Sequence, residues 1–106
     1  PGSYEAPLAV KKLLRDPAIT LIVVLGYIER GQTLHGEVMG HVVHKSLLEL
    51  ELEYEKPIGM GIIGPGATLE QAEARKVDYA RAAVRAAFRL HRILQEYDRH
   101  VSDTRT

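Results

Sequence analysis

The segment Gly31-Gln32-Thr33-Leu34-His35 places a hydroxyl and an imidazole two residues apart, directly after an apolar stretch. In an open sheet of parallel strands, ligands bind just outside the carboxyl ends of the strands, where a loop of this kind lies. His35 is a candidate general acid and base, because imidazole gains and loses a proton near neutral pH. Gly31, Gln32 and Thr33 are candidate phosphate ligands at the start of a helix. The same residues also suit a plain turn and a histidine bonded to backbone, so both interpretations stay open.

A second group of charged residues follows the turn Gly64-Pro65-Gly66. Arg75 and Arg81 lie on the next expected helix, and a guanidinium can hold a phosphate through two parallel hydrogen bonds. The turn is not a P-loop, because no Lys-Ser or Lys-Thr pair follows at the required spacing. A solvated basic face explains the same arginines, so the phosphate clamp remains a hypothesis.

The histidines do not form a metal motif. His41 and His44 are three residues apart, whereas a zincin helix needs two histidines four residues apart with an adjacent glutamate. The chain has no cysteine, which excludes thiolate metal sites and disulfides. We therefore expect no metal site.

The charge balance argues against polyanionic partners. Lys and Arg together number 14, as do Asp and Glu, so no global field favours nucleic acid or an acidic membrane. The longest apolar run, residues 19–26, is far shorter than the ~20 residues of a membrane span. No basic and then apolar leader opens the sequence. We expect one cytoplasmic domain that binds neither nucleic acid nor membrane.

Helices and strands alternate along the chain. Residues 19–25 form a continuous aliphatic run, apolar on both faces, which is typical of a buried parallel strand. Residues 58–63 predict a second strand, and the two glycines inside it indicate close approach of a ligand or another backbone. Residues 68–71 fit a capping box. The order predicts an α/β fold with two parallel strands and three helices; the helices are expected at residues 3–15, 34–55 and 68–97.

The expected domain covers residues 1–97, followed by a polar tail over residues 98–106 that should fray. A two-stranded sheet flanked by three helices is marginal by itself. The strand at residues 19–25 also lacks a partner on one side. The sequence therefore predicts the later part of a larger domain, N-terminally incomplete, whose first strands lie upstream.

Four motifs in order resemble the lumazine synthase family of riboflavin biosynthesis, in its archaeal-type form. The resemblance extends to about residue 94 and implies a three-layer α/β/α fold with a parallel sheet in flavodoxin-like order. Only the later two strands and three helices of that fold would be present here. The motifs are PGSYEAPLA at residues 1–9, LGYIERGQTLH at 25–35, the segment 57–66, and TLEQA at 68–72 followed by Arg75.

The resemblance also implies an activity and an assembly. Family members are transferases that condense 5-amino-6-ribitylamino-uracil with 3,4-dihydroxy-2-butanone 4-phosphate to 6,7-dimethyl-8-ribityllumazine, releasing phosphate and water. Imine formation, phosphate loss and ring closure proceed without a metal or organic cofactor. Positioning the two small-molecule substrates can supply much of the rate. Members are homo-oligomers, pentamers with the site between adjacent subunits, and in some of them twelve pentamers form a hollow shell of sixty subunits.

Carried over position by position, the resemblance makes His35 the proton-transfer residue. Arg75 of the neighbouring subunit would be the main counter-charge of the phosphate, and Arg81 falls near a lysine that contacts substrate in many members. Tyr27 and Ile28 would line the pyrimidine pocket. The other implied substrate contacts are Gly31, Gln32 and Thr33 around the phosphate, Ser3, Tyr4 and Glu5 along the ribityl chain, and Met60 and Ile62 from the neighbouring subunit.

Two alternatives share the fold. An archaeal-type riboflavin synthase would dismutate two lumazine molecules, but that family has a different loop without the Gly-Gln-Thr-x-His pattern. A non-catalytic member that forms a shell or binds a flavin would have lost turnover. The retention of His35 and Arg75 argues against this second alternative.

Overall fold

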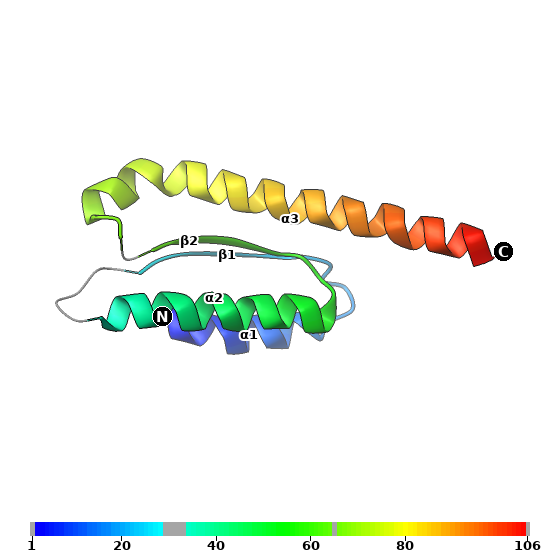
Figure 1. Cartoon of the computed structure of the whole chain (residues 1–106), viewed down its shortest axis with the longest axis horizontal. Helices are drawn as coiled ribbons and strands as arrows, with labels where there is room; N and C mark the ends of the chain where they lie inside the picture. The colour runs from blue at the N-terminus through cyan, green and yellow to red at the C-terminus, as the bar shows by residue number, and fades with distance from the viewer. Residues whose placement is uncertain (1, 29–33, 65, 106) are drawn as a thin grey trace.

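Two short apolar segments form the parallel sheet at the centre of the molecule, β1 (Ile22–Tyr27) and β2 (Ile58–Ile63) (Figure 1). The computed structural model describes residues 2–28, 34–64 and 66–105, and of Arg105 only the backbone. The strands pair from Ile22 opposite Ile58 to Tyr27 opposite Ile63. Within the described residues β1 has β2 as its only strand partner, so its other edge presents unpaired backbone groups.

The first strand starts later and ends later than the sequence predicts. Residues 19–25 were expected, but a turn holds the chain up to Ile19. The backbone N–H of Ala18 donates to the Asp16 carboxylate at 2.9 Å, and the N–H of Ile19 donates to the Asp16 carbonyl at 3.1 Å. These bonds keep residues 18 and 19 out of the sheet, so the expected start at residue 19 was wrong.

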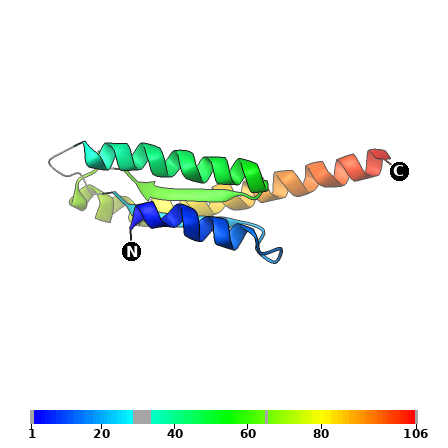
Figure 2. The same ribbon diagram turned by 90° about the horizontal axis from the view of Figure 1, so that it is seen from below.

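Helices cover both faces of this sheet, which confirms the predicted α/β/α layering. A short 3₁₀ turn, η1 (Ser3–Glu5), leads into α1 (Ala6–Leu14). α1 and α2 (His35–Tyr54) lie side by side on one face (Figure 2). α3 (Leu69–Arg105) covers the other face and contacts both strands.

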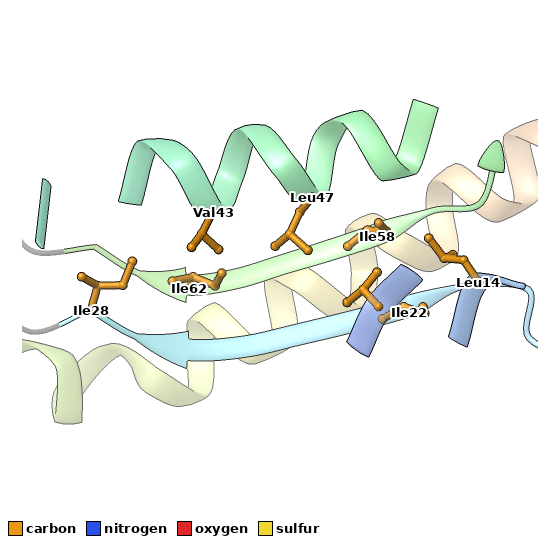
Figure 3. Packing of buried hydrophobic residues seen from close by; sticks show 8 residues of the cluster. Leu14, Ile22, Ile28, Val43, Leu47, Ile58 and Ile62 are labelled. Atoms are coloured by element: carbon orange, nitrogen blue, oxygen red, sulfur yellow. The ribbon is translucent and has the colours of Figure 1, made fainter. Parts of the chain in front are cut away.

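The main hydrophobic core lies between the sheet and the α1–α2 layer (Figure 3). Val43 and Leu47 of α2 are completely buried and point toward β2. Full burial of an aliphatic side chain of this size stabilises a fold by about 1.5–3 kcal/mol. This layer therefore holds α2, and with it His35 at its first residue, against the end of the sheet. The buried members of the core are Val10, Leu14, Ile22, Ile28, Val43, Leu47, Ile58 and Ile62.

The two glycines of β2 allow α3 to approach the sheet closely. A Cβ at Gly59 would overlap the carbonyl oxygen of Ala83 and lie 3.0 Å from its carbonyl carbon. A Cβ at Gly61 would lie 3.1 Å from the Ala83 Cβ. Ala83 and Ala87 are accordingly buried. The expected close approach is confirmed: the backbone of α3 approaches Gly59, and the side chains of Leu25 and Ala83 approach Gly61.

The capping box at the start of α3 is confirmed. The N–H of Thr68 donates to the Gln71 amide oxygen at 3.0 Å, and the N–H of Gln71 donates to the Thr68 hydroxyl at 3.1 Å. The expected end of this helix near residue 97 was wrong, because α3 continues to Arg105. Residues 98–105 contain no glycine or proline to interrupt the helix, so the polar C-terminal segment is helical where the sequence predicted fraying.

Candidate active site

A cavity of about 330 Å³ lies between the N-terminal turn and the carboxyl-terminal half of β1. The cavity brings together Ser3 and Tyr27, two of the predicted substrate contacts, and also Ile62, which the resemblance places in the site from the neighbouring subunit. They come from η1, β1 and β2, which are distant in sequence. The residues that line the cavity are Gly2, Ser3, Ala6, Val24, Leu25, Gly26, Tyr27 and Ile62.

The imidazole of His35 contacts the ring of Tyr4, and neither residue lines this cavity. The two ring centroids are 5.9 Å apart and the ring planes meet at 65°, an edge-to-face arrangement. Both side chains are exposed, and Tyr4 directly follows Ser3, which lines the cavity. The fold therefore joins the start of α2 to the N-terminal motif, with the His35 imidazole against the residue that follows Ser3.

Glu5 folds back toward Gly2, near the start of the N-terminal motif. Its backbone N–H donates to the Gly2 carbonyl at 3.2 Å. A Cβ at Gly2 would lie only 2.9 Å from a carboxylate oxygen of Glu5. The absence of a side chain at Gly2 thus makes room for this carboxylate beside Gly2, which lines the cavity.

The two predicted pyrimidine contacts, at the end of β1 and directly after it, differ in their surroundings. Tyr27 lines the cavity, and its hydroxyl donates to the Ala67 carbonyl at 3.1 Å, which ties the end of β1 to the turn after β2. Ile28 is only 3% exposed and belongs to the hydrophobic core, so its side chain lies outside the cavity lining. Its backbone N–H donates to the Ile63 carbonyl at 2.9 Å.

The predicted cations lie on α3, away from this cavity. Arg81 lines a separate apolar groove of about 610 Å³ between the edge of β1 and α3. Lys76 and Glu73, paired at 2.7 Å, line the same groove. Arg75 is exposed and lines neither space, and Met60 packs half-buried against the main core. One copy of the chain therefore does not bring Arg75 or Met60 to the cavity beside Ser3.

Three predicted phosphate contacts, Gly31, Gln32 and Thr33, fall outside the described residues.

The sequence patterns did not predict a role for Gly26, which lines both the cavity beside Ser3 and the groove beside Arg81. A Cβ at Gly26 would meet only the Ser3 hydroxyl at 3.8 Å and Ile62 at 4.0 Å, so this glycine leaves open volume. Its position within an aliphatic strand was the available signal, because glycine there often marks close approach of a ligand.

His41 and His44, the other histidines of α2, belong to no group of metal ligands among the described residues. The Nδ1 of His44 donates to the Gly40 carbonyl, one turn earlier, at 2.7 Å. Among residues 2–28, 34–64 and 66–104, no three His, Asp or Glu side chains gather as metal ligands would. The described part of the chain also contains no helix that is both long and apolar enough to cross a membrane.

Comparison with known proteins identifies similar sequences. The family model described as 6,7-dimethyl-8-ribityllumazine synthase matches residues 1–95. A curated protein of that name from Metallosphaera sedula is 46% identical over 92 residues, covering 87% of this chain and 61% of the relative. The protein of the same name from Archaeoglobus fulgidus is 40% identical over 98 residues, covering 92% and 68%. That from Staphylothermus marinus is 44% identical over 90 residues, covering 85% and 60%. The chain thus spans about three fifths of the first and third relatives.

Proposed function

Because the chain belongs to the 6,7-dimethyl-8-ribityllumazine synthase family, we propose that it takes part in forming that lumazine from a ribityl-pyrimidine diamine and a four-carbon ketose phosphate. The cavity lined by Ser3 and Tyr27, together with the contact of His35 with Tyr4, the residue after Ser3, is the observation that supports this most directly. The comparisons do not favour the archaeal-type riboflavin synthase, because the matching family model and the relatives above carry the lumazine synthase name.

The proposed chemistry needs proton transfer at several steps. The primary amine of the pyrimidine attacks the ketone of the phosphate substrate, and loss of water gives an imine. Elimination of phosphate and attack by the second amine then close the ring with loss of another water. His35 would move protons to and from the nitrogen and oxygen atoms in these steps, which typically contributes about 10²–10⁴-fold in rate. No metal or organic cofactor enters the proposed reaction.

The pyrimidine and its ribityl chain would occupy the cavity beside β1. The Ser3 backbone would donate and accept hydrogen bonds along the polyol, and the Glu5 carboxylate would accept them. Tyr27 would contact the ring with its face, since its hydroxyl is engaged by Ala67. The open volume at Gly26 supports entry of a flat ring next to the strand.

The phosphate would lie at the start of α2, near Gly31, Gln32 and Thr33, where helix amides favour anions. Arg75 would complete this site from a neighbouring copy. Met60 and Ile62 of that copy would close the pyrimidine pocket, and Arg81 would be a further substrate contact. The distance of Arg75 from the cavity lining within one chain supports a site made by two subunits. The Ile62 side chain is only 6% exposed because it packs in the core of its own chain, so it would add little contact surface to an interface with another copy.

Assembly into a ring is part of the proposal. The outer face of α2 carries exposed apolar side chains along its length, and contiguous apolar surface marks interfaces. Val38 and Leu52 are 52% and 69% exposed. Packing this face against neighbouring copies would remove it from water and would bring Arg75 of one copy toward His35 of the next. The exposed apolar residues of this face are Leu34, Val38, Val42, Leu48 and Leu52.

The test is turnover with both substrates, followed by the absorbance of the lumazine and by release of inorganic phosphate. We expect His35→Asn to lower kcat by roughly 10²-fold or more while the oligomeric mass is unchanged. His41→Asn is the matched control, because His41 is another exposed histidine of α2. A wild-type protein without lumazine formation, or equal loss in both variants, would contradict the proposal. Arg75→Ala should raise KM for the phosphate substrate, and Arg85→Ala should not.

A further inference from the structure

α3 continues well beyond the sheet that it covers (Figure 1). Ala87 is the last of its residues close to a β2 glycine, facing Gly59 near the start of that strand. At about 1.5 Å per residue, residues 88–105 extend the helix by roughly 27 Å. The family model ends at residue 95, so residues 96–105 of this projecting arm lie outside the family match.

The arm carries a regular apolar seam. The seam continues the row of Ala83 and Ala87 that packs on the sheet, with the same alternation of three and four residues. Such spacing keeps apolar side chains on one side of a helix and is the pattern of coiled coils. Tyr97 is 63% exposed, and the other three members are half-buried. The seam residues of the arm are Leu90, Leu94, Tyr97 and Val101.

We infer that this seam pairs with the same seam of a second copy of the chain, with the two arms antiparallel. In that register Leu90 lies opposite Val101 of the other copy, and Leu94 lies opposite Tyr97. The same two contacts repeat by two-fold symmetry, as in any isologous interface. The bodies of the two copies then lie at opposite ends of the paired arms.

Charge complementarity favours a second copy of the chain as the partner of the seam and favours the antiparallel direction of the two helices. His91 and Asp98 flank the seam on the same side, seven residues apart, too far to pair within one helix. The antiparallel register brings His91 of each copy beside Asp98 of the other, twice in the pair. A parallel pair would instead bring Ile93 beside Asp98. Residues flanking a coiled-coil seam set partner and orientation in this way.

The basic residues of the arm support the same arrangement. Arg92 and Arg99 of the arm, with Arg85 just before it, repeat every seven residues on the opposite side of the helix from the seam. All three are exposed. They would remain in water when the arms pair, so the pairing buries no like charges.

Cysteine cross-linking between two differently marked proteins tests the register directly, because the natural chain has no cysteine. Leu90→Cys protein mixed with Val101→Cys protein should give a mixed disulfide dimer under mild oxidation. Each protein alone should cross-link several-fold less, since residue 90 of one copy lies far from residue 90 of the other. Arg85→Cys is the control for random collision. Self cross-linking of each variant would show a parallel pair, and yields no higher than the control would show no pairing; either result overturns the inference.

A charge exchange gives an independent measurement by sedimentation. His91→Glu and Asp98→Lys should each weaken self-association several-fold, because each variant sets like charges against each other or removes the attraction. The double variant should restore association to within about twofold of wild type. Failure of the double variant to recover would overturn the antiparallel register. Lumazine formation should be unchanged in all three variants, so the result is separate from the proposed function.

Discussion

Gly59 offers the sharpest test of how closely α3 packs on the sheet. A methyl group at this position would overlap the carbonyl oxygen of Ala83 and would also lie 3.2 Å from the Ala87 Cβ. The overlapped atom belongs to the backbone of a long helix, so it cannot rotate away as a flexible side chain could. Gly59→Ala must therefore shift α3 or the strand.

The cost of Gly59→Ala follows from this geometry. Added methyl groups in well-packed interiors cost typically about 1–3 kcal/mol in the free energy of unfolding, and a backbone obstacle places this site near the upper end. A loss of about 3 kcal/mol lowers the folded-to-unfolded ratio roughly a hundredfold. With an m-value of about 1.5 kcal/mol per molar, the midpoint of urea unfolding should fall by about 2 M at fixed protein concentration.

Gly64→Ala is the matched control, because a Cβ there would meet no heavy atom within 4 Å and the Gly64 backbone has no positive φ. Its unfolding free energy should stay within about 0.5 kcal/mol of wild type. Ala83→Gly should fail to rescue Gly59→Ala, because the obstacle is a backbone carbonyl. Equal midpoints for Gly59→Ala and Gly64→Ala would refute the close contact between α3 and β2.

Three further predictions address other contacts. Gly26→Val should fill the cavity beside Ser3 and raise KM for the pyrimidine at least about tenfold. The urea midpoint should change little, because valine suits a strand. An unchanged KM would show that the substrate does not bind in this cavity. Tyr27→Phe should lose the bond to Ala67 and about 1 kcal/mol of stability, measured by urea unfolding; a smaller loss than 0.3 kcal/mol would be inconsistent with that bond. Lys56→Met should lower the free energy of unfolding by about 1–2 kcal/mol, because the Lys56 ammonium donates to the carbonyls of Leu14 and Asp16 at 2.8 and 3.1 Å. Lys45→Met is the control and should lower it by under about 0.5 kcal/mol, because the ion pair of Lys45 with Glu49 is exposed.

Local signals predicted the elements well. The aliphatic run before Gly26 and the glycine-containing run after Pro57 are both strands, and the capping residues Thr68 and Gln71 bond as the pattern requires. These features depend on neighbouring residues, so a sequence can specify them without knowledge of the packing. The start of β1 depended on the Asp16 turn, whose side-chain bond to Ala18 competes with strand pairing.

The site was predictable only where one chain carries it. Ser3, Tyr27 and Ile62 line one cavity because the parallel pairing and the α1–α2 layer bring their elements together. Arg75 lies on the α3 side of the sheet, and no periodicity within the chain specifies which surface of another copy it would meet. The assignment of Arg75 to a neighbour's site comes from the family resemblance and remains a prediction.

Glycine has opposite consequences at two positions of the same sheet. At Gly59 the backbone of α3 occupies the space where a side chain would lie, so the helix packs closely on the sheet. At Gly26 nothing closer than 3.8 Å occupies the corresponding space, and a cavity remains beside the N-terminal turn. Gly26 is exposed, so this opening lies at the surface of the sheet and not in its interior. A methyl group should therefore be tolerated by the fold at Gly26 and rejected at Gly59, so substitutions at Gly26 test the proposed substrate contact separately from the stability of the fold.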